Sequence, residues 1–234
     1  MVLVRDGVFR RRGRGGEDVL DSTTGYLRVP GDEHEIAHPC DRGDRFTTIE
    51  LTAGLADRAR LPAESARFRT SPAVDLEHRR LLAALRRGDD GAAEERALAL
   101  VARALGVQRP GDGRGAHQRL ARDARELLAL EPALTLQELA KRLHYSPHHV
   151  SRVFSAHTGE TVARHRTRLR VRWVAERLAD GERDLARLAA DAGLVDASHL
   201  SRLVRREHAL LPSTLRAALA PSLTGSRSPS CRRP

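Results

Sequence analysis

The chain of 234 residues is poor in aromatic residues and cysteine, and it has no long apolar run. Aromatic side chains make up 3% of the sequence, so a core must consist mostly of Leu, Val and Ala, which favours helices over stacked sheets. The two cysteines, Cys40 and Cys231, cannot provide a disulfide framework. We therefore expect a protein of a reducing compartment.

Several signatures of other protein classes are also missing. No apolar run approaches the roughly 18 residues of a membrane helix, and the N-terminus lacks the apolar segment of a secretory signal. Phosphate-binding loops, dinucleotide-binding glycine motifs, CxxC pairs and nucleophile elbows do not occur. We expect a cytoplasmic protein that is not an enzyme, needs no cofactor and has no membrane partner.

Positive charge is abundant, and it is concentrated in the C-terminal part. The formal net charge is +10. Residues 117–219 hold 18 Lys and Arg against 12 Asp and Glu, whereas residues 1–116 hold 20 against 19. This asymmetry is typical of a protein whose C-terminal part contacts a polyanion. The alternative is a solvated basic surface with no partner.

Residues 1–52 have the pattern of β-strands. Short apolar or alternating runs are separated by clusters of Gly, Asp and Pro. The runs are Val2–Val4, Val8–Arg10, Tyr26–Val29, His34–Ala37 and Phe46–Leu51. Because the first run begins at residue 2, no strand precedes it to pair with. We expect a β region that is incomplete on its N-terminal side.

Residues 72–106 change to a helical period. Ser71 and Pro72 are a helix cap and a first helical residue. Val74, Leu81, Leu82 and Leu85 form one apolar stripe that ends at Gly88. A second helix, Ala92–Leu105, ends at Gly106. The apolar faces of this hairpin could cover the sheet or a second subunit. A Gly-rich linker is expected at 107–116, and a disordered basic tail at 220–234.

Two segments after the linker repeat each other. Residues 136–154 and 185–204 share L-x-x-L-A followed by H-(V/L)-S-R-(V/L), with one extra residue in the second copy. Each predicts a helix, a tight turn and a second helix. Thr135 with Glu138 predicts a capping box for the first copy, and Gly193 predicts a left-handed turn residue in the second. Further caps are expected at Ser146, Asp184 and Asp196.

The exposed faces of the two second helices are short and polar around an arginine. In the first copy they are His148, Ser151 and Arg152; in the second they are Ala197, Ser198, Ser201 and Arg202. The segment Thr161–Ala179 between the copies contains Arg164, Arg166, Arg168, Arg170 and Arg172, and its apolar stripe includes Trp173. A plain helical bundle would be the alternative, but the repeat, the charge and the spacing together favour DNA.

With these motifs, residues 117–219 resemble the DNA-binding domain of AraC/XylS-type transcriptional regulators. The most specific stretches are 192–208 and 211–216. The resemblance implies seven helices with two helix-turn-helix units, a double-stranded DNA partner, RNA polymerase as a second partner, and a transcription activator. The residues it implies at the DNA are Ser146, Pro147, His148, Ser151, Arg152, Asp196, Ala197, Ser198, His199, Ser201, Arg202, Arg205 and Arg206.

Residues 1–106 resemble the back half of the cupin-like sensor domain of these regulators, with its helical hairpin. This resemblance implies an α+β protein, a small-molecule effector and a homodimer formed through 72–106. The C-terminal part departs from the family in several places. His144 and Ala209 stand where Gly is usual, and Leu194, Leu200 and Val204 replace larger aromatics. A strained turn and a thinner second core are expected.

His34-Glu-Ile-Ala-His38 matches the HExxH signature of zinc peptidases. That chemistry needs both histidines on one face of a helix, with Glu35 as the general base. Nearby prolines leave room for about two turns at most, and a strand would turn Glu35 away from His34 and His38. The alternatives are a zinc hydrolase, a metal-binding sensor site at His34 and His38, or ordinary strand histidines. A helical module that binds a protein partner is a third functional hypothesis.

Overall fold

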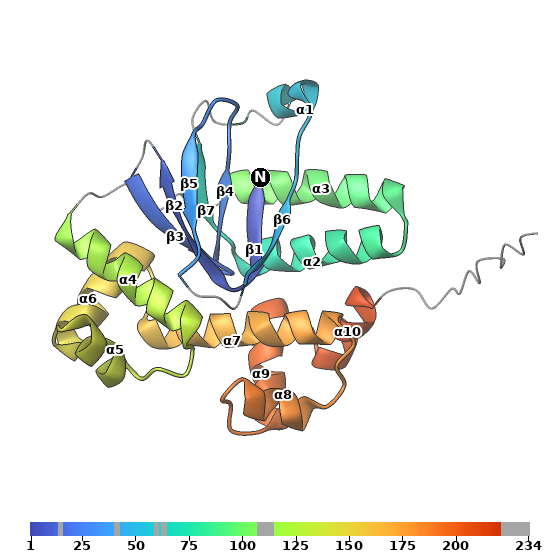
Figure 1. Cartoon of the computed structure of the whole chain (residues 1–234). Helices are drawn as coiled ribbons and strands as arrows, with labels where there is room; N and C mark the ends of the chain where they lie inside the picture. The colour runs from blue at the N-terminus through green and yellow to red at the C-terminus, as the bar shows by residue number, and fades with distance from the viewer. Residues whose placement is uncertain (14–15, 40–42, 59–60, 62–64, 107–114, 221–234) are drawn as a thin grey trace, which may run out of the picture.

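The computed structural model describes residues 1–13, 16–39, 43–58, 61, 65–106 and 115–220. A β part and a helical part pack against each other, and the long helix α7 (Val162–Ala179) runs along the boundary (Figure 1). The predicted linker at 107–116 and the predicted tail at 220–234 fall almost wholly outside the described residues. Both cysteines do so as well.

The β part contains two antiparallel sheets. The first has the order β6-β1-β4-β7, and the second β3-β2-β5. The strands are β1 (Val2–Asp6), β2 (Val8–Gly13), β3 (Gly16–Asp21), β4 (Thr24–Leu27), β5 (His34–Ala37), β6 (Arg45–Thr48) and β7 (Ala66–Arg69). Each of the five predicted runs overlaps a strand, so the β assignment of this region is confirmed.

Several elements were not predicted from the sequence. Strand β3 begins with polar residues, and the four-residue strand β7 and the short helix α1 (Ala53–Arg58) lie outside the ranges predicted to form strands or helices. Strand β1 has a neighbour on each edge, and the expectation of a β region that is incomplete on its N-terminal side stays a prediction. This strand pairs with β4 on one edge and with β6 on the other, because strands that come later in the chain supply both neighbours.

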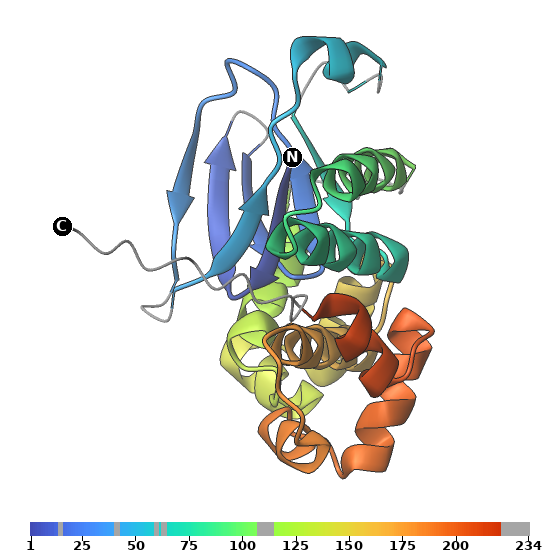
Figure 2. The same ribbon diagram turned by 90° about the vertical axis from the view of Figure 1, so that its right-hand side faces the viewer.

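Alternation along β1 divides the β part into two cores. Leu3 packs with Phe68 and the helical hairpin α2–α3, whereas Val2 and Val4 pack with Phe9 and Leu20 of the other sheet. The hairpin consists of α2 (Pro72–Arg86) and α3 (Asp90–Leu105). It lies along the outer face of the four-stranded sheet (Figure 2). Of the two coverings considered for its apolar face, the sheet is the one observed.

The predicted stripe of α2 is only partly correct. Val74 and Leu81 are buried, but Leu85 is 52% exposed. Ala83 and Ala84 lie inward instead, because small side chains let α2 approach its neighbours closely. The caps are as predicted: the Ser71 hydroxyl accepts a hydrogen bond from the Val74 amide at 3.3 Å. The homodimer through 72–106 stays a prediction.

The helical part has the seven helices expected between residues 115 and 220. They are α4 (Ala116–Leu130), α5 (Leu136–Leu143), α6 (Pro147–Thr158), α7, α8 (Leu185–Asp191), α9 (Ala197–His208) and α10 (Pro212–Leu219). Val162 and Leu169 of α7 belong to one core with α4, α5 and α6, and Val174 and Leu178 belong to another with α8, α9 and α10. Helix α7 is therefore shared by both units, as predicted.

Two helix ends carry backbone strain. Among the described residues, His144 (φ 59°) and Ala209 (φ 57°) are the non-glycine residues with positive φ. His144 follows α5 and Ala209 follows α9, the two places where the sequence departs from the expected glycine. A side chain in this left-handed conformation costs roughly 1–2 kcal/mol.

We predict that Ala209→Gly raises the free energy of unfolding by about 1 kcal/mol, because glycine adopts positive φ without a steric penalty. Ala156→Gly is the matched control at an exposed position inside α6, and it should lower the free energy of unfolding by about 1 kcal/mol. Urea unfolding followed by circular dichroism measures both. An unchanged or lower stability of the Ala209 variant would contradict the strain.

Candidate nucleic-acid interface

Side-chain hydrogen bonds cap the N-terminus of both helices in the first helix-turn-helix unit. The Thr135 hydroxyl accepts from the Glu138 amide at 3.2 Å, and the Glu138 carboxylate accepts from the Thr135 amide at 2.8 Å. The Ser146 hydroxyl accepts from the His149 amide at 3.2 Å at the start of α6. These contacts satisfy backbone donors that α5 and α6 would otherwise leave unpaired.

The second unit is built in the same way with different residues. Asp184 caps α8 through the Ala186 and Arg187 amides, and Asp196 caps α9 through the His199 amide at 2.6 Å. Gly193 turns the chain between the helices with φ 64°. The predicted caps and the predicted left-handed residue of this unit are therefore confirmed.

The buried sides of the two second helices are those that the repeat predicts. Val150, Val153 and Phe154 of α6 are buried, and so are Leu200, Leu203 and Val204 of α9. Leu200 and Val204 have no exposed surface. These small side chains are thus fully buried, although the resemblance implies larger aromatics at positions 200 and 204.

The outward residues divide into those that are free and those already bonded within the protein. His148, Arg152, Ser198, Arg202, Arg205 and Arg206 are exposed, as is Pro147; Ser151, Ala197, His199 and Ser201 are partly exposed. The Ser201 hydroxyl donates to the Ala197 carbonyl at 2.8 Å. Ser146 and Asp196 are exposed, but their side chains act as helix caps. Both units therefore present an exposed arginine at matching positions, Arg152 and Arg202.

Most arginines of α7 do not form a basic surface, contrary to the expectation from their number. Arg164 is the exposed one. Arg166 donates to the Pro132 and Ala133 carbonyls, and Arg170 to the Pro132 and Gly193 carbonyls. Arg168 and Arg172 are buried against the β part. The bonds to carbonyls and acids in other segments come from tertiary packing, which a charge count along the sequence does not include.

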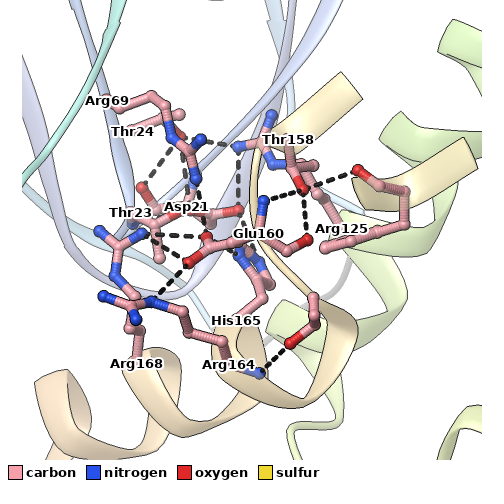
Figure 3. A network of polar contacts seen from close by, with 12 residues as sticks. Asp21, Thr23, Thr24, Arg69, Arg125, Thr158, Glu160, Arg164, His165 and Arg168 are labelled. Carbon is pink, nitrogen blue, oxygen red and sulfur yellow. Dashed lines mark hydrogen bonds and ion pairs between the residues drawn. The ribbon is translucent and has the colours of Figure 1, made fainter. Parts of the chain in front are cut away.

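A polar network that the sequence did not predict joins the β part to α4 and α7 (Figure 3). Asp21 of β3 accepts from Arg125 of α4 at 2.9 Å, and His165 of α7 lies 3.8 Å from the same carboxylate. Glu160, just before α7, accepts from Arg69 of β7 and from Arg168 at 2.9 Å each. The hydrogen bonds Arg69–Glu160 and Arg125–Asp21 join residues that are 91 and 104 positions apart in the sequence.

The charges in this network are matched. Burial by itself would raise the pKa of Asp21, but Arg125, His165 and the hydrogen bonds from Thr23 outweigh it and hold the pKa well below its ordinary value. Burial likewise opposes ionisation of Glu160, yet the hydrogen bond with His165 and the Arg168 charge lower its pKa to about 2. Both acids are therefore carboxylates at neutral pH and hold the arginines in place.

A second cluster holds the other half of α7. Glu176 accepts from Arg79 of α2 at 2.9 Å and also pairs with Arg5 of β1. Arg79 bridges to Asp75 at 3.0 Å, and His208 at the end of α9 lies 3.8 Å from the Asp75 carboxylate. Helix α2 therefore contacts both the connector α7 and the second helix of the second unit.

The β part also contains a cavity of about 1070 Å³. Apolar side chains from both sheets and from α1 line it, including Phe9, Ile36 and Phe46. His34 and His38 line it as well, whereas Glu35 lies near Arg12. His34 and Glu35 therefore lie on strand β5, and His38 directly follows it. This agrees with the prediction that the nearby prolines leave too little room for the helix that HExxH chemistry needs. The described residues contain no group of three His, Cys, Asp or Glu side chains arranged to hold a metal ion.

Comparison with known proteins bears on the helical part. Residues 139–218 match the family described as a helix-turn-helix domain. No curated protein sequence matches the chain. The C-terminal domain of AraT, a response regulator from Geobacillus stearothermophilus, is 22% identical, with 47% of this chain and 94% of that chain covered and a TM-score of 0.43. ToxT from Vibrio cholerae O395 is 9% identical, with 93% and 88% covered and a TM-score of 0.41.

Both TM-scores lie under 0.5, so these two solved structures carry no argument about function. The argument depends instead on the matched segment and on the geometry of the two helix-turn-helix units. The family match falls within the seven-helix part, and it includes α6, α9 and the exposed Arg152 and Arg202. No described helix combines the length and the apolar character that crossing a membrane requires.

We predict that stability falls as the pH drops from 7.5 to 5. Burial lowers the pKa of His78 to about 4 and also lowers the pKa of His208. The folded state therefore favours the neutral imidazoles. The free energy of unfolding is unaffected by these histidines above about pH 6.5, and it decreases as the pH falls from there towards 4. His78 by itself should contribute a loss on the order of 1–2 kcal/mol by pH 5.

Urea unfolding at several pH values measures this loss. His78→Gln should flatten the dependence, since no imidazole is then left to protonate at that position. His148→Ala is the control, because its imidazole is exposed on α6, and it should retain the wild-type dependence. Equal stability of the wild-type protein at pH 7.5 and 5 would show that the buried histidines do not oppose protonation.

Proposed function

We propose, from the premise that residues 139–218 are a helix-turn-helix domain of the AraC type, that the protein is a transcriptional regulator that reads two adjacent segments of DNA major groove with α6 and α9. The observation that carries the proposal is the matched placement of Arg152 and Arg202. Each is exposed on the second helix of its unit, opposite a buried face of the same pattern.

The length of α7 supports a two-site reading by one chain. Its 18 residues correspond to about 27 Å. Successive major grooves on one face of DNA are about 34 Å apart. A rigid connector of this length, with one unit packed at each half, can present α6 and α9 to neighbouring grooves. The protein would not need a second subunit to contact both.

The exposed side chains suggest separate roles at the DNA. Arg152 and Arg202 suit bidentate contacts with guanine, and His148 and Ser198 suit looser contacts with base edges. Arg205 and Arg206, near the end of α9, suit phosphates. Ser146 and Asp196 would act indirectly by holding the helix starts, because their oxygens already accept backbone hydrogen bonds. Contact with RNA polymerase and a homodimer through 72–106 stay predictions.

We predict that Arg152→Ala and Arg202→Ala each weaken binding to the preferred DNA sequence by about 1–3 kcal/mol and relax the preference at their own positions. The preferred sequence is first obtained by selection from random DNA. Arg87→Ala, an exposed arginine at the end of α2, is the control and should change little. Titration of labelled duplexes at several salt concentrations gives the affinities.

Two outcomes of this titration are informative. If both variants keep the affinity and sequence preference of the wild type, the proposed readout by α6 and α9 is wrong. If the wild-type protein binds no DNA at low salt, a helical module that binds a protein partner becomes the better hypothesis, because the basic C-terminal part should at least bind DNA without sequence preference.

The cavity of the β part supports a second element of the proposal, an effector site. Its volume of about 1070 Å³ exceeds what a few water molecules fill, and pockets for small ligands are mostly apolar with a few polar groups. Here Phe9, Ile36 and Phe46 are the apolar lining, and His34 and His38 offer ring nitrogens. We propose an apolar small molecule with a polar group as the effector.

We predict that the dye anilinonaphthalene sulfonate binds the native protein and that Thr48→Trp weakens this binding about tenfold, because the indole would fill part of the cavity. Glu94→Ala on the exposed side of α3 is the control and should leave the dye affinity unchanged. Fluorescence titration measures both. Equal affinity in the Thr48 variant would place the dye, and the proposed effector, outside this cavity.

A further inference from the structure

Arg170 lies in the middle of α7, between the two helix-turn-helix units. Its Nε donates to the Pro132 carbonyl at 3.0 Å, and one of its Nη atoms donates to the Gly193 carbonyl at 3.2 Å. Pro132 belongs to the loop from α4 into α5, and Gly193 is the left-handed residue between α8 and α9. One guanidinium is therefore bonded to the backbone of both units.

Both carbonyls bonded by Arg170 lie close to the C-terminal end of a helix. Pro132 lies two residues beyond the end of α4, and Gly193 lies two residues beyond the end of α8. Carbonyl groups at the C-terminal end of a helix carry partial negative charge. Burial and then the neighbouring Arg166 lower the pKa of Arg170. The two carbonyl oxygens accept hydrogen bonds from the charged guanidinium, and such bonds favour the charged form.

The two units otherwise have separate cores. Helices α4, α5 and α6 pack around one, and α8, α9 and α10 pack around the other, with α7 common to both. The β part adds contacts to each unit, since Arg125 of α4 bonds to Asp21 and Ala83 of α2 packs in the second core, but these contacts do not join one unit directly to the other. A planar fork that holds one carbonyl on each side opposes movement of one unit against the other, and lysine could not hold both carbonyls in the same geometry.

We propose that Arg170 is the positioning residue that fixes the second unit relative to the first, and with it the spacing at which α6 and α9 meet DNA. This inference depends on the proposed function only for its DNA consequence. The Gly193 carbonyl lies four residues before Ala197, the first residue of α9. Movement of this turn therefore shifts α9 with its exposed residues Ser198 and Arg202.

The chain contains a matched control one turn earlier in the same helix. Arg166 donates to the Pro132 and Ala133 carbonyls, and both of these belong to the first unit. Arg166→Ala removes a similar arginine and similar carbonyl contacts without removing the bond to Gly193. Any difference between Arg166→Ala and Arg170→Ala therefore reports the link across the two units.

The first measurement needs no DNA. Spin labels are placed in the full chain at Ala156→Cys on α6 and Ser198→Cys on α9, with Cys40 and Cys231 replaced by serine. We expect a single narrow distance distribution in the parent and in Arg166→Ala, and a broadened or shifted one in Arg170→Ala. The same distribution in all three proteins would overturn the proposal.

The second measurement uses DNA. Duplexes carry the selected half-sites at their native spacing or with one to five base pairs inserted. We expect insertion to weaken wild-type and Arg166→Ala binding by about tenfold or more, but Arg170→Ala binding by less than about threefold. Binding to a single half-site should stay unchanged in all three. Wild-type spacing selectivity in Arg170→Ala, or equal loosening in both variants, would overturn the link.

Two further outcomes separate the hypotheses. Arg170→Lys keeps the positive charge and replaces Arg170→Ala in both measurements if the alanine variant does not fold. It should broaden the distribution of label distances to an intermediate extent. If the wild-type protein binds no DNA, the proposed function fails while the label distances still decide the role of Arg170. If Arg170→Ala no longer binds the half-site that α9 reads, Arg170 only supports the turn between α8 and α9, and the proposal is wrong.

Discussion

The buried guanidinium of Arg172 joins the connector helix to the β part. It has no exposed surface and donates to the Ser22 carbonyl and to the hydroxyl and carbonyl of Thr70. Burial lowers the pKa of Arg172 to about 10, so the side chain remains charged at neutral pH. An uncompensated buried charge is strongly destabilising. Helix α7 therefore cannot leave the β part without breaking these contacts, and the positions of both units follow from α7.

The side of α7 that faces the β part is polar, and its remaining surface packs into two apolar cores. Glu176 and Arg168 bind across to α2 and to the strand region, whereas Val162 and Leu178 belong to the cores of the two units. The proposed DNA-reading helices α6 and α9 thus share α7 in their cores, whereas the residues that line the proposed effector cavity all come from the β part. Under the proposed function, α7 is the element through which an effector that alters α2 or β7 would act on α6 and α9.

Local features of the helical part were predictable because their causes lie within a few residues. The capping box at Thr135 and Glu138, the caps at Ser146 and Asp196 and the turn at Gly193 all involve neighbours in the chain. The strained conformation of His144 followed from the absence of glycine where the turn requires positive φ. The burial patterns of α6 and α9 followed from their repeated apolar spacing.

Predictions failed where the partner of a residue lies far away in the sequence. Leu85 continues the apolar stripe of α2 but is 52% exposed. The short strands β3 and β7 were missed, and they are held by pairing with β2 and β4. The arginines of α7 looked like a basic surface. Their carbonyl and carboxylate partners lie up to 150 residues away, so no window along the chain includes them.

The sequence alone determined the two helix-turn-helix units, their caps, their left-handed turns and the outward arginines Arg152 and Arg202, because periodicity and capping act over one or two helical turns. Only the tertiary structure decided which arginines are free. It buried Arg168 and Arg172 against the β part and placed Arg170 between the two units. Packing decides whether a given arginine meets solvent, an acid or a carbonyl, and packing depends on the whole chain.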